Sequence, residues 1–122
     1  MKFLFVADPL EGFKTYKDST FAMMREAAAR GHTLYACEAQ HLRWQRGARV
    51  TALSRAFTLT GDAHDWFAPE APADVVLAEM DAVLMRSDPP FDSEYFYATH
   101  LLTQAEREGA RVFNKPSALR EH

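Results

Sequence analysis

The residues best suited to chemistry form one short segment, Arg86-Ser87-Asp88-Pro89-Pro90-Phe91-Asp92, directly after an apolar run. An arginine at the end of a strand presents a planar fork of N–H donors that binds a carboxylate through two hydrogen bonds. Two consecutive prolines restrict the backbone, so the loop loses little conformational entropy when a ligand orders it. The segment therefore predicts that Arg86 binds a carboxylate. The alternative is that Arg86 pairs with Asp88 or Asp92 and the prolines only shape a turn, and composition leaves both open.

A second candidate is the step Lys17-Asp18-Ser19-Thr20. Asp18 or Ser19 suits a helix N-cap, because either side chain accepts a hydrogen bond from a first-turn N–H group. The same residues also suit an anionic ligand, with the Ser19 hydroxyl and the first-turn N–H groups facing it and Lys17 adding positive charge. Capping is the simpler explanation for Asp18 alone, and the spacing does not separate the two readings.

Other chemistry finds little support in the sequence. The five histidines show no metal-ligand spacing, and the single cysteine argues against a structural zinc site. Cys37 ends a short apolar run, which is typical of a core residue rather than a nucleophile. Neither a Gly-rich dinucleotide motif nor a phosphate loop is present. We therefore expect no catalytic, cofactor-binding or metal-binding residue in this chain.

The elements that would position these side chains alternate between strands and helices. Apolar runs predict strands at residues 2–7, 33–37, 81–85 and 111–113. Helical spacing predicts one helix from Asp18 or Ser19 to Gly31 and another from Asp92 or Ser93 to Gly109. This order predicts an α/β domain with a mainly parallel sheet and flanking helices. Since loops converge at the carboxyl ends of parallel strands, we expect Arg86 and the Lys17–Ser19 step at one edge.

The middle of the chain is less regular. Residues 42–59 suggest an inserted β-hairpin with Gly47 at its turn. Residues 61–73 contain Pro69 and Pro72 and predict a surface loop with a short helical turn. Pro116 suits the first position of a new helix, which has barely begun at His122. That ending suggests a piece of a longer chain.

Composition narrows the function classes. The chain has 122 residues, the size of one domain, and its 14 Lys and Arg against 17 Asp and Glu give a charge of −3. This slightly acidic balance argues against a nucleic-acid or polybasic membrane partner. Residues 3–7 are too short for the core of a signal peptide, and no run is long enough to span a bilayer. With a lone cysteine, these features predict a cytoplasmic protein.

Several stretches together resemble the N-terminal domain of bacterial glutathione synthetases, an ATP-grasp ligase family. The segment Met85-Arg86-Ser87-Asp88-Pro89-Pro90-Phe91-Asp92 is the most specific, although Ser87 stands where the resemblance leads us to expect lysine. The hairpin segment matches only loosely. The other matching stretches cover nearly the whole chain in the family's order: Asp8-Pro9, residues 17–23, Arg30-Gly31-His32, Asp65-Trp66-Phe67, Tyr97-Ala98-Thr99 and residues 114–120.

The resemblance implies a ligase that joins γ-glutamylcysteine to glycine through an acyl phosphate, with ATP and Mg²⁺ bound by an ATP-grasp domain C-terminal to residue 122. Residues 1–122 would then form a flavodoxin-like, pre-ATP-grasp domain on the substrate side, inactive by itself. In this reading Arg86 contacts substrate, and Lys17, Asp18 and Ser19 shape the same edge. It also implies a homo-oligomer.

The alternative is a non-catalytic flavodoxin-like module for binding, signalling or oligomerisation. A receiver domain of this type needs an acidic cluster after the first strand and an aspartate after a central strand. The sequence has a lone Asp8 at the first place and Arg86 at the second. This pattern favours the ligase over the non-catalytic module.

Overall fold

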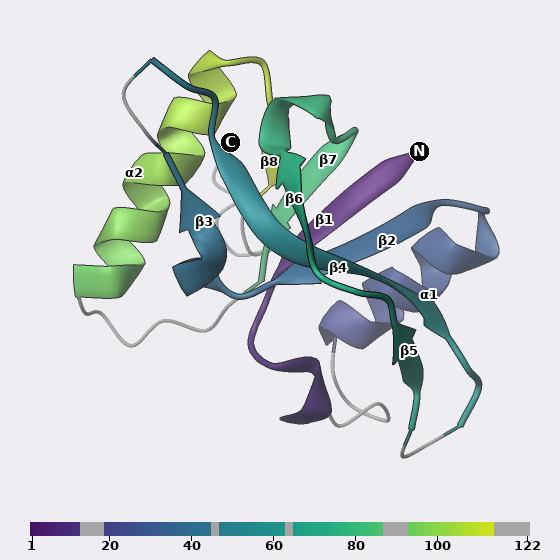
Figure 1. Ribbon diagram of the computed structural model, residues 1–122. Helices are drawn as coiled ribbons and strands as arrows, with labels where there is room; N and C mark the ends of the chain where they lie inside the picture. Colours follow the sequence, from purple (N-terminus) through teal and green to yellow (C-terminus); the bar gives the residue numbers. More distant parts are fainter. Residues whose placement is uncertain (13–18, 45–46, 63–64, 87–92, 114–122) are drawn as a thin grey trace.

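The computed structural model describes residues 1–12, 19–44, 47–62, 65–86 and 93–113. These residues form two α-helices, eight strands and three single 3-10 turns (Figure 1). The strands are β1 (Lys2–Val6), β2 (Thr33–Cys37), β3 (Leu42–Arg43), β4 (Thr51–Leu59), β5 (Phe67–Pro69), β6 (Ala73–Val76), β7 (Ala82–Met85) and β8 (Val112–Phe113). The helices are α1 (Ser19–Ala29) and α2 (Ser93–Arg107), and the 3-10 turns are η1 (Leu10–Gly12), η2 (Ala39–His41) and η3 (Leu77–Glu79).

The sheet has the order β3-β4-β2-β1-β7-β8, with β5 and β6 also paired to β4. Strand β1 runs parallel to β2 and β7, and β7 runs parallel to β8. The antiparallel strands are those of the insertion, because β4 runs antiparallel to β2, β3, β5 and β6. The expected α/β domain with an inserted hairpin is confirmed. Gly47 has a φ of +82°, which suits the predicted turn.

The segment from 61 to 73 differs from the sequence expectation. We expected a surface loop with a short helical turn, yet its described residues contain β5, and β6 begins at Ala73. Pro69 is the last residue of β5 and pairs with Phe57, on an edge strand where the missing N–H group costs no ladder bond. The Glu70 amide then donates to the Ala56 carbonyl at 2.8 Å. The prolines therefore mark the step from one short strand to the next rather than a break in the sheet.

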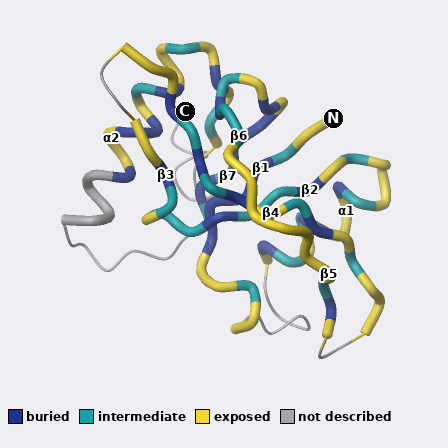
Figure 2. Tube along the Cα trace, viewed as in Figure 1, coloured by how far each residue is buried: buried dark blue, intermediate teal, exposed yellow. Residues whose placement is uncertain are grey.

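Each face of the sheet is covered by one helix. In β1, Leu4 and Val6 face the cluster that contains the buried side of α2, whereas Phe5 faces the cluster that contains α1. Figure 1 accordingly shows α2 and α1 on opposite sides of the sheet, and Figure 2 shows burial concentrated in its central strands. Among residues 98–107 of α2, whose burial is described, the buried ones are Ala98, Leu101, Leu102 and Ala105. Helical spacing in the sequence predicts an apolar stripe of Tyr95, Ala98, Leu102 and Ala105, and the last three of these are buried. The side chain of Tyr95 lies outside the described residues.

Both helices end as the sequence predicts. After α1, the Gly31 amide donates to the Ala28 carbonyl at 3.0 Å and the His32 amide donates to the Ala27 carbonyl at 3.1 Å. Gly109 occupies the equivalent place after α2. Its φ of +108° is a conformation that residues with a Cβ rarely adopt. The predicted capping residues Asp18 and Asp92 and the helix expected at Pro116 lie outside the described residues.

Candidate substrate-binding edge

The strand order reverses between β1 and β7, which are neighbours at the centre of the parallel part of the sheet. The chain leaves β1 toward α1 on one face and leaves β7 toward α2 on the other. A crevice forms at such a reversal, outside the carboxyl ends of the strands, and ligands of α/β proteins bind there. Arg86 extends the pairing by one residue, since its amide donates to the Val6 carbonyl at 2.7 Å. Arg86 therefore lies at the reversal of strand order between β1 and β7.

The Arg86 side chain reaches across from β7 to the start of α1. Its Nε donates to Thr20 Oγ1 at 3.1 Å, and its Nη2 donates to Ser19 Oγ at 2.9 Å. The structure thus brings Arg86 and Ser19 together at one edge. Thr20 is buried, and its only signal in the sequence is weak, as the second hydroxyl in a Ser-Thr pair. Its contact explains why the arginine is fixed at two points rather than one.

The third nitrogen of the guanidinium group, Nη1, is buried and has no hydrogen-bond partner among the described residues. An unpaired buried donor on a charged group is costly, so it marks a place where an acceptor would stabilise the protein. Lys17 and Asp18 lie outside the described residues, as do Asp88 and Asp92, the alternative partners of Arg86. The binding role of these residues stays a prediction.

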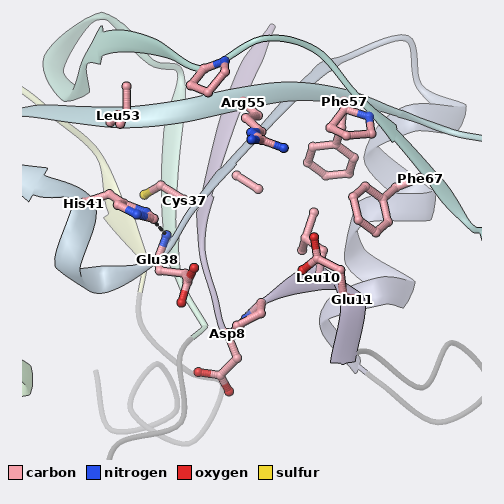
Figure 3. A pocket seen from close by; sticks show the side chains of 14 residues that line it. Asp8, Leu10, Glu11, Cys37, Glu38, His41, Leu53, Arg55, Phe57 and Phe67 are labelled. Carbon is pink, nitrogen blue, oxygen red and sulfur yellow. Dashed lines mark hydrogen bonds between the residues drawn. The ribbon is translucent and has the colours of Figure 1, made fainter.

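A cavity of about 320 Å³ opens at the same edge of the sheet, on the β2–β4 side of β1 (Figure 3). It is bounded by the chain after β1, by the end of β2 and η2, and by one side of β4 and β5. Neither Arg86 nor Ser19 lines it. Sequence reasoning missed the cavity because β4 and β5, which form one wall, come together only through long-range pairing. Its lining residues are Asp8, Pro9, Leu10, Glu11, Ala36, Cys37, Glu38, His41, Leu53, Arg55, Phe57, Phe67, Pro69 and Pro72.

Cys37 lies in the wall of this cavity, and its side chain is only 7% exposed. Burial, with a smaller contribution from the Glu38 carboxylate, raises the pKa of the Cys37 thiol from 9.0 to about 12. A thiol in this setting keeps its proton at neutral pH, and the thiolate is the nucleophile. The structure therefore agrees with a core role for Cys37.

We expect Cys37 to make stability depend on alkaline pH. Between pH 9 and 12 the folded thiol keeps its proton while the unfolded thiol loses it. The free energy of unfolding should therefore fall by about 1.4 kcal/mol per pH unit in this interval because of this group. Urea unfolding of the chain and of Cys37→Ala at several pH values would measure this fall. The other titrating groups are present in both proteins, so their contribution cancels in the difference between the two free energies of unfolding. Equal slopes for the two proteins would contradict the raised pKa.

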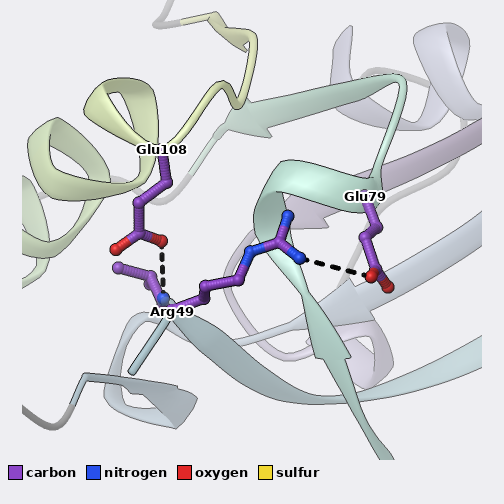
Figure 4. A network of polar contacts seen from close by, with 4 residues as sticks. Arg49, Glu79 and Glu108 are labelled. Atoms are coloured by element: carbon purple, nitrogen blue, oxygen red, sulfur yellow. Dashed lines mark hydrogen bonds and ion pairs between the residues drawn. The ribbon is translucent and has the colours of Figure 1, made fainter. Parts of the chain in front are cut away.

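A second polar cluster ties the hairpin to the end of α2 and is structural (Figure 4). Glu108 Oε1 accepts a hydrogen bond from the buried Val50 amide at 2.7 Å, and Glu108 Oε2 accepts one from Gln104 at 3.1 Å. Arg49 and Glu79 form an exposed ion pair beside it at 3.5 Å. Exposed pairs of this kind contribute little to stability, whereas an unpaired buried amide is costly. Glu108 is therefore the important member.

Replacing Glu108 by alanine should lower the free energy of unfolding by about 1–3 kcal/mol, because the Val50 amide loses its acceptor. Glu108→Gln keeps an acceptor oxygen and should lose less. Glu106→Ala, at an exposed position in the last turn of α2, is the matched control. Urea denaturation of the three variants measures the differences. A loss in Glu106→Ala equal to that in Glu108→Ala would show that the Val50 contact is unimportant.

These observations define a doubly wound α/β domain with a polar edge at its strand reversal. The family model "Prokaryotic glutathione synthetase, N-terminal domain" matches residues 1–120. The chain belongs to this family. Its relatives include the glutathione synthetase of Ralstonia nicotianae, which is 56% identical over 122 residues, all of this chain and 37% of the relative. The glutathione synthetase of Neisseria meningitidis serogroup B is 50% identical over 99% of this chain and 39% of the relative. The chain therefore spans less than two-fifths of the length of these relatives.

Proposed function

We propose that residues 1–122 are the N-terminal, substrate-side domain of a glutathione synthetase. The complete enzyme would join γ-glutamylcysteine to glycine, with hydrolysis of ATP to ADP and phosphate and with a cysteinyl acyl phosphate as intermediate. The family match over nearly the whole chain supports this proposal, as does the share of the relatives that it covers. The ATP-grasp domain would lie C-terminal to residue 122. In the described part of the chain, no helix is long and apolar enough to cross a membrane. We further propose a cytoplasmic homo-oligomer.

The hydrogen bonding of the Arg86 guanidinium group is the observation that supports substrate binding by this domain. Its Nε and Nη2 atoms are held by Thr20 and Ser19, and Nη1 lacks a partner in the described structure. A carboxylate bound through the Nε–Nη2 side would have to displace both hydroxyls. A substrate carboxylate that displaces the atoms covering the buried Nη1 would instead complete the hydrogen bonding of a cation that is already oriented. Lys17 would add positive charge nearby, and Asp18 would shape the start of α1.

The sites for ATP and Mg²⁺ are proposed to lie in the ATP-grasp domain. No three His, Cys, Asp or Glu side chains gather there as metal ligands, and the sequence has no phosphate loop. Mg²⁺ bound with nucleotide phosphates takes its protein ligands from one or two carboxylates, which the proposed ATP-grasp domain would supply. This domain would contribute substrate contacts and one wall of the site.

A chimeric enzyme tests the proposal. The matching segment of the Ralstonia nicotianae glutathione synthetase is replaced by this chain, and phosphate release is measured with and without each substrate. We expect release that requires ATP, γ-glutamylcysteine and glycine together. The parent enzyme and a version without the segment are the controls, and circular dichroism confirms folding. A folded chimera without turnover, or turnover by residues 1–122 alone, would contradict the proposal and favour a non-catalytic module.

A further inference from the structure

The cavity beside β4 contains charges of both signs that are not paired with each other. Arg55 projects from β4 on one wall, and Glu11 and Glu38 come from the opposite side, with Asp8 at the rim (Figure 3). In the described part of the chain the ion pairs are Arg30–Glu26 and Arg49–Glu79, so Arg55 meets no carboxylate there. An arginine that shares a cavity with three carboxylates and contacts none of them is available to an anionic group from outside.

The wall between these charges is apolar. Phe57 and Phe67 meet edge to face, with ring centroids 6.4 Å apart, and Leu10 and Leu53 complete the surface. Phe57 also meets the buried Trp66 edge to face, so it is packed from behind the wall. The size of about 320 Å³ falls within the range of small-molecule pockets, which combine an apolar lining with a few placed polar groups.

The acidic side is also positioned by local contacts. The Glu38 amide donates to His41 Nδ1 at 3.1 Å, and the His41 amide donates to the Glu38 carbonyl at 2.9 Å. These bonds close the η2 turn and fix the backbone from which Glu38 projects. Glu11 lies in η1, whose Gly12 amide donates to the Pro9 carbonyl at 3.0 Å. Both carboxylates therefore start from short turns with defined geometry.

We propose that this cavity is a second small-molecule site, which binds an α-amino acid with a large apolar side chain. The carboxylate of the ligand would bind Arg55, its ammonium group would face Glu11 and Glu38, and its side chain would pack on Phe57 and Phe67. The site is distinct from the Arg86 edge, because Arg86, Ser19 and Thr20 do not line the cavity. Both sites adjoin the connection between β1 and α1, since Asp8 lines the cavity and Ser19 begins α1.

Calorimetric titration of the 122-residue chain with three probes tests each charge separately. L-Phenylalanine carries both charged groups, 3-phenylpropionate lacks the ammonium group, and 2-phenylethylamine lacks the carboxylate. We expect phenylalanine to bind and each analogue to bind at least about tenfold more weakly, as the loss of one charge-assisted hydrogen bond implies. Equal affinities for the three probes, or no binding of phenylalanine at millimolar concentration, would overturn the proposal.

Variants of the charged residues test which wall of the cavity binds each group of the ligand. Arg55→Gln should weaken the binding of phenylalanine and phenylpropionate about tenfold and leave that of phenylethylamine unchanged. The double variant Glu11→Gln/Glu38→Gln should weaken the binding of phenylalanine and phenylethylamine about tenfold and leave that of phenylpropionate unchanged. Arg43→Gln, an exposed arginine outside the cavity, is the matched control and should change none of the affinities. Circular dichroism checks folding, and Arg55→Lys gives a second, more conservative change at this position. Unchanged phenylalanine binding in folded Arg55→Gln, or displacement of phenylalanine by γ-glutamylcysteine, would overturn a separate site.

Discussion

Substituting Arg86 by alanine in the chimeric synthetase should lower kcat/KM for γ-glutamylcysteine by about 30- to 1000-fold, which corresponds to about 2–4 kcal/mol. The variant removes the guanidinium group whose Nη1 would bind the substrate carboxylate. It also releases Ser19 and Thr20 at the start of α1. Steady-state kinetics with varied γ-glutamylcysteine at saturating ATP and glycine measure the effect.

Two controls separate binding from a structural role of Arg86. Arg86→Lys keeps the charge but has no planar fork to bridge Ser19 and Thr20, so its kcat/KM should fall between those of the parent and the alanine variant. Urea unfolding of residues 1–122 with Arg86→Ala gives the stability cost by itself. If kcat and KM stay unchanged while stability falls, Arg86 only joins β7 to α1, and the substrate contact lies elsewhere.

Replacing Trp66 by alanine should lower the free energy of unfolding by about 3–5 kcal/mol. The side chain is 3% exposed, and its ring meets Phe21 of α1 edge to face at 5.1 Å and Phe57 of β4 at 6.3 Å between centroids. Removal would leave a cavity at the point where α1 covers the sheet, and the aromatic contacts would be lost as well. Urea denaturation followed by circular dichroism measures the loss.

The chain provides its own control for this variant in Trp44, which is 39% exposed. Trp44→Ala removes the same side chain from a much more exposed site, so its cost should be well below that of Trp66→Ala. Trp66→Phe keeps part of the aromatic volume and should fall between them. Equal losses at the two tryptophans would mean that Trp66 does not anchor α1.

The agreement between sequence and structure is best where the signal is local. The strand over residues 33–37 has the predicted bounds, and Gly31 and Gly109 close their helices as expected. Arg86 and Ser19 were predicted to share an edge because parallel strands place their carboxyl ends together, and the structure brings them into contact. This rule of sheet topology was enough to predict that the two residues lie close together, although they are far apart in the sequence.

The misses depend on contacts that sequence spacing does not record. Strand β5 contains only three residues and ends in a proline, and it forms because β4 offers it an edge. The cavity has the same origin, since Arg55 and Phe67 belong to strands that pair at long range. A charged residue within the predicted second strand of the hairpin was the available signal, but its neighbours across the sheet were unknown.

Strand β4 has little freedom to change its length. One part of it pairs with β3 and β6 and the next with β2 and β5, so four neighbours fix a single alignment. Because side chains alternate between faces, one residue inserted between Ala52 and Phe57 would turn either the α2-facing part or the aromatic wall to the wrong side. Evolutionary gain and loss of residues in this domain should therefore collect in the connections on either side of β4 and spare the strand itself.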